Sequence, residues 1–262
     1  MPDIRAWMVA KVPLRYRTTT RYWYRALAGR LDRELPLLKR LLRPGSRVLD
    51  VGANAGLYAY AFGRFAPVEA FEPLPEPARA LRALATRVAG IRVHEVALSD
   101  HDGTADLYVP YVGDAPHSEL ARFERPAGRA ERVVVTVRTL DGFALEDVGL
   151  LKIDVEGHER AVLAGSADTI ARERPILFIE IEQRHLADDI RHTFGAVTAL
   201  GYHGHFMDAD GSLQPLEAFR YERHQAPYIG HDTDPRYVND FLFIHTTDER
   251  SAALLARERH HR

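Results

Sequence analysis

The stretch VLDVGANAGLYAYAFGRFAPVEAFEPLPEP, from Val48 to Pro77, decides the fold of this chain. It starts as a short apolar strand, passes through a glycine-containing turn into an amphipathic helix, and ends with a second strand that closes at Glu72. Strands that alternate with helices predict a mostly parallel sheet with helices on both faces, the doubly wound α/β architecture. Ligands bind outside the carboxyl ends of the strands in such sheets, so the turn after Asp50 is the first candidate site.

Two classes of enzyme share this strand–turn–helix opening: those that transfer a hydride from a dinucleotide and those that transfer a methyl group from S-adenosylmethionine. The residues of the glycine turn distinguish between them. A dinucleotide fingerprint needs glycine at Asn54 and Leu57, because a pyrophosphate requires a bare backbone. The methyl donor carries no phosphate, and an acidic Asp50 suits its amino group or sulfonium. Glu72 follows Gly52 by 20 residues, where a carboxylate can accept hydrogen bonds from both ribose hydroxyls. The turn therefore favours the methyl donor, with another nucleotide or a purely structural turn as alternatives.

Composition narrows the remaining classes of protein. The 262 residues carry 35 basic and 37 acidic side chains, a net charge of −2, which provides no overall positive field to attract a nucleic acid. The chain has no cysteine, which excludes disulfides, thiolate metal sites and cysteine nucleophiles. The first 17 residues do not read as a signal peptide, and no apolar run reaches the roughly 18 residues that span a bilayer. We expect a soluble, cytoplasmic protein without a membrane span.

Hydrophobic periodicity extends the same alternation along the chain. The last two strands have no helix between them, so one of them is expected to be antiparallel. The predicted strands are 48–50, 68–71, 91–96, 150–154, 176–181, 202–207 and 241–245, with two short ones over TADLYVP and RVVVTVR, and the predicted helices are 57–65, 75–85, 159–171 and 187–200.

Two segments fall outside this alternation. Apolar residues three or four apart from Tyr22 to Leu42 predict a helix that Pro44 and Gly45 stop. This helix can pack on the core, which is the favoured role, or cover the sheet edge, wall a pocket or pair with a second copy of the chain. The segment 111–131 is rich in proline, glycine and charge, and we interpret it as a mobile or substrate-facing loop.

A second group of polar residues follows the strand predicted over 150–154. The segment LLKIDVEGHERAVLAG places Asp154, Glu156 and His158 at the end of that strand and at the start of its helix. They should therefore face the same crevice as Gly52 and Glu72. Acidic residues at a helix start also suit the helix dipole, so a purely structural role stays open.

The next strand adds acidic residues to this group. The segment ILFIEIEQRH places Glu180, Glu182 and His185 at or after its end. Hard cations take oxygen ligands, so Asp154 with Glu180 or Glu182 is a candidate site for Mg²⁺ or Ca²⁺. A bound metal is not the favoured interpretation, because such carboxylates more often bind the donor, steer the acceptor or act as a base.

A hydroxyl is a poor nucleophile at neutral pH, so methyl transfer to oxygen calls for a positioned base. His158 is the first choice, because its ordinary pKa of about 6.5 suits proton acceptance near neutrality. Asp154 or Glu156 takes this role if His158 points away, and His117 in the loop is a further candidate.

The motifs together resemble the FkbM family of S-adenosylmethionine-dependent methyltransferases. They extend from about Val48 to Phe219, and in order they read VLDVGANAGLY, AFEPLPE, VALSDHDG, VRTLDGF, LLKIDVEGHE and ILFIEIE. The resemblance implies a seven-stranded class I, Rossmann-like fold. From the sequence pattern we expect an N-terminal helical extension (1–45), a methyltransferase domain (46–248) and a C-terminal tail (249–262). It also implies O-methylation of a hydroxyl on a sugar, polyketide or other secondary metabolite, by SN2 transfer with base assistance.

The resemblance also implies a role for each matching residue. Asp154, Glu156 and His158 would stand beside the reacting methyl group, and Asp154 would also contact the donor. Glu72 would hold the ribose. The methionine part of the donor would be cradled by Asp50, Gly52, Ala53, Asn54 and Gly56, and its adenine would lie along Ala97, Leu98 and Ser99.

Three other classes stay open. An NAD(P)-dependent oxidoreductase or epimerase predicts G-x-G-x-x-G and Y-x-x-x-K, and the chain has neither. A nucleic-acid methyltransferase acting on amino groups predicts D/N-P-P-Y/F where this chain has DVEG. A non-catalytic donor-binding scaffold would not need the acidic cluster. We expect a small-molecule or glycan acceptor and no nucleic-acid partner, with homo-oligomerisation through the N-terminal helix as an option.

Overall fold

The computed structural model of the chain describes residues 12–231 and 234–260. The first eleven residues of the predicted N-terminal extension, and most of the segment tested for a signal peptide, lie outside these ranges.

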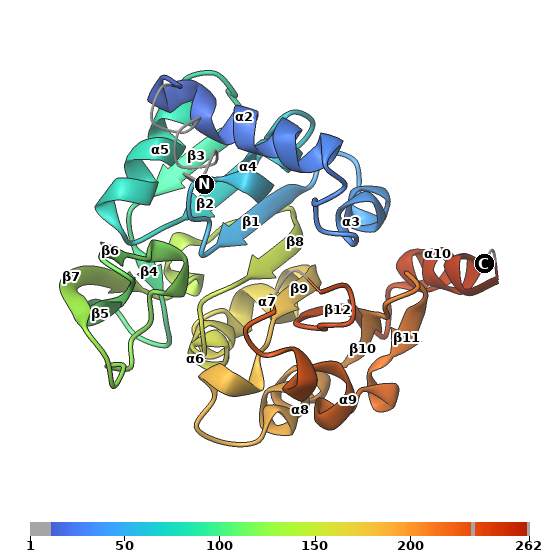
Figure 1. Cartoon of the computed structure of the whole chain (residues 1–262). Helices are drawn as coiled ribbons and strands as arrows, with labels where there is room; N and C mark the ends of the chain where they lie inside the picture. The colour runs from blue at the N-terminus through green and yellow to red at the C-terminus, as the bar shows by residue number, and fades with distance from the viewer. Residues whose placement is uncertain (1–11, 232–233, 261–262) are drawn as a thin grey trace.

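An eight-stranded sheet in the order β11-β10-β12-β9-β8-β1-β2-β3 forms the centre of the molecule (Figure 1). The strands β3, β2, β1, β8 and β9 are parallel, whereas β12 runs antiparallel to both β9 and β10. The predicted fold class and the antiparallel strand are confirmed, and β11 adds an eighth strand beside β10. The strands are β1 (Arg47–Val51), β2 (Val68–Phe71), β3 (Ile91–His94), β8 (Val148–Ile153), β9 (Ile176–Glu180), β10 (Tyr202–Met207), β11 (Leu213–Pro215) and β12 (Asp240–His245).

Helices cover the sheet, and one of them is interrupted where the sequence predicts continuity. The helix expected over 159–171 is two helices, α6 (Glu159–Ala164) and α7 (Ala167–Glu173). The chain bends at Gly165, where a Cβ atom would come 1.9 Å from the carbonyl oxygen of Ser99. The other helices are α4 (Leu57–Gly63), α5 (Pro75–Ala85), α8 (Ile190–Ala199), α9 (Tyr221–His224) and α10 (Glu249–His260).

The N-terminal helical stripe is likewise two helices, so the prediction of one helix from Tyr22 to Leu42 is wrong. α2 (Leu14–Leu27) ends before Gly29, whose φ of 64° is left-handed, and α3 (Leu35–Leu41) restarts with a proline in its first turn. α2 packs across α4 and α5 of the same chain (Figure 1). The Thr18 hydroxyl donates to the carbonyl oxygen of Ala55 at 2.5 Å, so α2 is anchored on the glycine turn.

A second, four-stranded sheet in the order β4-β7-β5-β6 lies beside the main one. Its strands are β4 (Ala97–Leu98), β5 (Gly103–Val112), β6 (Ala115–Pro116) and β7 (Ala130–Arg138). The two short strands expected here are confirmed and are longer than expected. The predicted loop 111–131 is partly ordered into β6 and the 3₁₀ turn η1 (Ser118–Leu120), and Arg21 of α2 forms an ion pair of 2.6 Å with Glu119 in that turn.

The carboxyl ends of β1 and β8 meet in a backbone contact that requires glycine. The amide of Asp154 donates to the carbonyl oxygen of Val51 at 3.1 Å. Gly52 follows with a left-handed φ of 74°, and a Cβ atom on it would come 1.8 Å from the Asp154 carbonyl oxygen. The glycine turn and the DVEG segment are therefore held together by the backbone itself.

Replacing Gly52 by alanine should separate these two segments. We expect Gly52→Ala to lower the free energy of unfolding by at least about 3 kcal/mol, because the clash adds to the roughly 1–2 kcal/mol that a left-handed φ costs an alanine. Gly113→Ala is the matched control, since Gly113 has a φ of 65° with no atom of the described structure within 4 Å of its Cβ position. Urea unfolding measures both, and equal losses would contradict the close contact.

Candidate active site

The glycine turn presents a buried carboxylate without a hydrogen-bond partner. Asp50, near the end of β1, is 1% exposed, and its carboxylate oxygens have no hydrogen-bond partner within 3.5 Å in the described part of the chain, although Oδ1 forms an ion pair with Lys152. Burial raises the pKa of Asp50, and the Lys152 ammonium, 3.9 Å away, opposes that rise. A buried carboxylate of this kind suits a positively charged ligand group. The neighbouring turn ends at Gly56, whose φ of 87° starts α4.

Glu72 stands beside this turn at the end of β2, where the sequence predicts it. Its two carboxylate oxygens accept from the amide of Asn54 at 2.9 Å and from that of Leu74 at 2.8 Å. The side chain is buried, and burial raises its pKa to about 7. Glu72 therefore contacts the glycine turn directly, and its role toward the ribose stays a prediction.

Lys152 is a site residue that the sequence interpretation missed. Its ammonium lies 2.9 Å from Asp154 Oδ2 and 3.9 Å from Asp50 Oδ1, and 4.9 Å from the centre of the Tyr58 ring. Burial alone would lower the pKa of Lys152, but Asp154 and Asp50 together raise it, so the side chain stays charged. A single lysine inside the apolar strand LLKI was the available signal, because buried charges need partners.

A small acidic pocket lies beside Asp154. It receives side chains from the end of β8, the start of α6 and the end of β9, and four of the predicted site residues meet in it. Its lining residues are Asp154, Glu156, Gly157, Glu159, Glu180, Glu182 and His185, and we call this group the acidic pocket.

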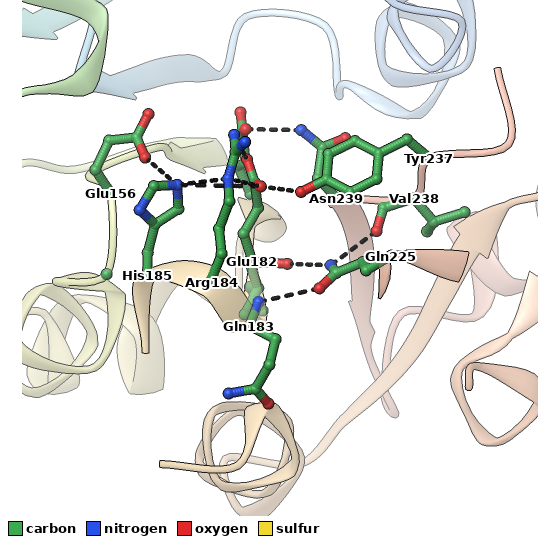
Figure 2. Close-up of polar contacts among 12 residues, drawn as sticks. Glu156, Glu182, Gln183, Arg184, His185, Gln225, Tyr237, Val238 and Asn239 are labelled. Atoms are coloured by element: carbon green, nitrogen blue, oxygen red, sulfur yellow. Dashed lines mark hydrogen bonds and ion pairs between the residues drawn. The ribbon is translucent and has the colours of Figure 1, made fainter. Parts of the chain in front are cut away.

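Glu156 and His185 form a close pair in the acidic pocket (Figure 2). Glu156 Oε2 lies 2.8 Å from His185 Nε2, and burial raises the pKa of Glu156 against the opposing effect of His185. Both Glu156 and Gly157 have left-handed φ values, 53° and 98°, and a Cβ atom on Gly157 would come 2.4 Å from the His185 carbonyl oxygen. His185 Nδ1 is buried without a hydrogen-bond partner among the described residues.

The two carboxylates after β9 are held by residues from the C-terminal part of the chain. The hydroxyl of Tyr237 donates to Glu182, and Asn239 donates its side-chain amide to Glu180 Oε1 at 2.7 Å (Figure 2). Arg184 also contacts Glu182, with Nε 2.6 Å from Oε2. The sequence interpretation missed Tyr237 and Asn239, which lie in a stretch without periodicity.

The carboxyl groups proposed as metal ligands already accept hydrogen bonds from the protein. Asp154 Oδ2, Glu180 Oε1 and both oxygens of Glu182 accept from protein donors, and the Mg²⁺ or Ca²⁺ site stays a prediction. Across residues 12–231 and 234–260, no three histidine, aspartate or glutamate side chains are grouped to hold a metal ion.

His158 lies apart from the acidic pocket. Its Nε2 is 2.8 Å from the Ser99 hydroxyl, and its ring centre is 4.2 Å from that of Phe123 in the segment after β6. Burial lowers the pKa of His158. The first-choice base thus neighbours Ala97, Leu98 and Ser99, the predicted adenine side, whereas Asp154 and Glu156 face the acidic pocket. His117 is exposed.

Comparisons with known proteins place the chain in a family. A family model described as the methyltransferase FkbM domain matches residues 50–204. The chain belongs to the FkbM methyltransferase family. The 31-O-demethyl-FK506 methyltransferase FkbM of Streptomyces tacrolimicus is 33% identical over 215 residues, which cover 68% of this chain and 78% of that protein. The 2-O-methyltransferase NoeI of Sinorhizobium fredii (strain NGR234) is 29% identical over 175 residues, or 57% of this chain and 69% of NoeI.

Family membership makes the protein an S-adenosylmethionine-dependent methyltransferase and overturns the oxidoreductase alternative. The crystal structure of methyltransferase FkbM from Methylobacillus flagellatus is 16% identical with a TM-score of 0.48, covering 91% of this chain and 57% of that one. The present chain therefore spans less than two thirds of the length of that relative. None of the described helices of this chain is long and apolar enough to cross a membrane.

Glu159 gives the acidic pocket a measurable pH signature. It is 2% exposed, Oε1 accepts from the amide of Gly157 at 2.8 Å, and Oε2 has no partner among the described residues. Burial raises its pKa to about 7, whereas an unfolded glutamate has a pKa of about 4.3. The folded protein therefore keeps this proton between these pH values while the unfolded chain releases it, so stability falls as the pH rises through this window.

Glu159→Gln should remove this loss, since glutamine still offers an oxygen to Gly157 and carries no proton to release. Relative to wild type, we expect the variant to gain up to about 3 kcal/mol in free energy of unfolding between pH 4.5 and pH 8. Urea unfolding at both pH values measures the difference. The exposed Glu124→Gln is the control, and the same pH response in both variants would contradict the assignment to Glu159.

Proposed function

We propose that this protein transfers the methyl group of S-adenosylmethionine to a hydroxyl of a small-molecule or glycan acceptor. Two relatives support transfer to oxygen, because their names describe O-methylation. The acidic pocket supports a small acceptor over a nucleic acid, since its described lining residues include carboxyl groups and no lysine or arginine that could bind a phosphate backbone. The cytoplasmic location and association through the N-terminal helix stay predictions.

The observation that carries the proposal is that Asp154 belongs to both parts of the site. The carbonyl oxygen of Asp154 lies against Gly52 of the glycine turn, and Asp154 is also one of the residues that line the acidic pocket. The pocket has a volume of about 10 Å³, room for one small group, so it can receive the reacting hydroxyl and not the whole acceptor. A donor held at the turn and a hydroxyl that reaches this pocket would therefore be neighbours. Holding two reactants in line accounts for much of the acceleration available to a methyl transfer.

The residues of the turn fit the donor. Asp50 offers a cationic group buried oxygens that lack a hydrogen-bond partner among the described residues, and Glu72 offers its carboxylate to the ribose hydroxyls. We assign the methionine part to the turn from Gly52 to Gly56 and the adenine to Ala97, Leu98 and Ser99. Bound S-adenosylmethionine supplies an already activated methyl group on a sulfonium, so the protein has to orient the acceptor oxygen, exclude water and accept one proton.

The pair Glu156–His185 fits the role of base better than His158. Glu156 Oε2 and Arg184 Nε both approach His185 Nε2, at 2.8 and 2.9 Å, and the guanidinium can only donate. In the proposed tautomer, Arg184 gives up this contact and Nε2–H is donated to the Glu156 carboxylate, so that Nδ1 carries the lone pair that accepts the hydroxyl proton. The carboxylate fixes the tautomer and stabilises the imidazolium that forms. His158 shares its Nε2 with Ser99 and lies outside the acidic pocket.

Glu72 is tested by donor binding alone. We expect Glu72→Ala to weaken S-adenosylhomocysteine binding about 10- to 100-fold, the effect of losing hydrogen bonds to a charged group. Isothermal titration calorimetry measures this affinity without an acceptor. Glu76→Ala, an exposed glutamate on α5, is the control. Unchanged affinity in Glu72→Ala would show that the ribose is held elsewhere.

The base is tested by turnover. His185→Gln should lower kcat roughly 10²–10⁴-fold, the usual contribution of a general base, while S-adenosylhomocysteine affinity stays at the wild-type value. His158→Gln should stay within about tenfold of wild type. S-adenosylhomocysteine release is measured with hydroxyl-bearing sugars and macrolides, including 31-O-demethyl-FK506, as acceptors. The reverse ranking of the two variants would assign the base to His158.

A further inference from the structure

Gln225, the residue after α9, uses its side-chain amide to join two separate segments of backbone. The side chain is buried, with the residue 1% exposed. Its Nε2 donates to the carbonyl oxygens of Ile181 and Val238, each at 2.8 Å, and its Oε1 accepts from the amide of Gln183 at 3.0 Å (Figure 2). Both donor hydrogens and one acceptor position of the amide are therefore occupied.

The backbone groups that Gln225 holds flank the acidic residues of the pocket. Ile181 and Gln183 lie on either side of Glu182, and Val238 lies between Tyr237 and Asn239. The same amide thus sets where Tyr237 meets Glu182 and where Asn239 meets Glu180.

We propose that Gln225 is a positioning residue of the acceptor site, acting through Tyr237 and Asn239 on the carboxyl groups of Glu182 and Glu180. This inference rests on the proposed function, in which the acidic pocket receives the acceptor hydroxyl. A carboxyl group with one oxygen held by a fixed donor has fewer orientations open to it, so it meets the acceptor in a prepared position. Gln225 lies beyond residues 50–204, the range matched by the family model.

A packing role alone would not need this amide. A leucine fills a similar volume, but it would leave the two buried carbonyl groups of Ile181 and Val238 and the part-buried amide of Gln183 without this partner, and such groups are costly in a protein interior. The cost falls on the two segments that carry Glu182 and Tyr237. The glycine turn has no contact with this amide, so donor binding should be independent of Gln225.

The test is carboxyl labelling of the full-length protein, saturated with S-adenosylhomocysteine, by a carbodiimide and glycine ethyl ester, read by peptide mass spectrometry. Tyr237→Phe should raise labelling at Glu182 alone, and Asn239→Leu at Glu180 alone, by roughly three- to tenfold, as expected for one lost hydrogen bond. Gln225→Leu should raise both. Gln225→Glu, which keeps the acceptor for Gln183 and loses the donors, should do the same if the leucine variant does not fold.

Two controls make the result decisive. Gln214→Leu, on the edge strand β11, should leave labelling at Glu180 and Glu182 unchanged, and the exposed Glu124 serves as the internal reference. Calorimetry should give the wild-type S-adenosylhomocysteine affinity for the Gln225 variants. Labelling that stays unchanged at Glu180 and Glu182, or a rise at every carboxyl group with loss of donor binding, would overturn the proposal. If the wild-type protein failed to bind S-adenosylhomocysteine, the proposed function would fail, and labelling without that ligand would still decide the role of Gln225.

Discussion

The buried ammonium of Lys152, between Asp50 and Asp154, is the interaction on which the site depends. It lies on β8, and it draws a carboxylate of β1 and one at the end of β8 toward the same point. Without Lys152, the carboxyl groups of Asp50 and Asp154 would face each other in a protein interior of low dielectric constant, and one of them would take up a proton. The close passage of Gly52 against Asp154 brings the strands together, and Lys152 makes their charges compatible. Together they allow a crevice with more carboxyl groups than cations.

The acidic pocket and the side chains that hold it come from two separate regions of the sequence. Its lining follows β8 and β9, which lie inside the region shared with the FkbM family. The side chains that hold Glu180 and Glu182 come from residues 237–239, outside that region. In the proposed function, Asp154, Glu156 and His185 thus lie inside the matched region, whereas Gln225, Tyr237 and Asn239 lie outside it.

Much of the fold could be predicted because its signals are local. The bounds of β2 and α5 match the predicted 68–71 and 75–85, since prolines mark the ends of these elements in the sequence. The break in the N-terminal stripe also has local signals, Gly29 and Pro36, which the periodicity overrode. The break at Gly165 is different. It depends on the Ser99 carbonyl, a neighbour 66 positions earlier in the chain. Periodicity describes one helix at a time and carries no information about such contacts.

The candidate site shows the same limit. Asp50, Glu72, Asp154 and Glu156 were predictable because each ends or follows a strand at the ligand-binding edge. His158 is the histidine nearest to Asp154 and Glu156 in the sequence, yet its side chain contacts Ser99. His185, which follows β9, contacts Glu156 instead. Tyr237 and Asn239 have no periodic context, so only the pairing of β12 with β9 brings them to the pocket.

The position of β12 also links the synthesis of this strand to the assembly of the site. β12 follows all the other described sheet strands in the sequence, and it enters between β9 and β10, not at an edge. A nascent chain that ends before residue 240 therefore exposes two unpaired strand edges, which can pair with other chains. Glu180 and Glu182 lack Asn239 and Tyr237 until shortly before that strand is made. Truncated products should thus be prone to aggregation as well as incompletely assembled at the site.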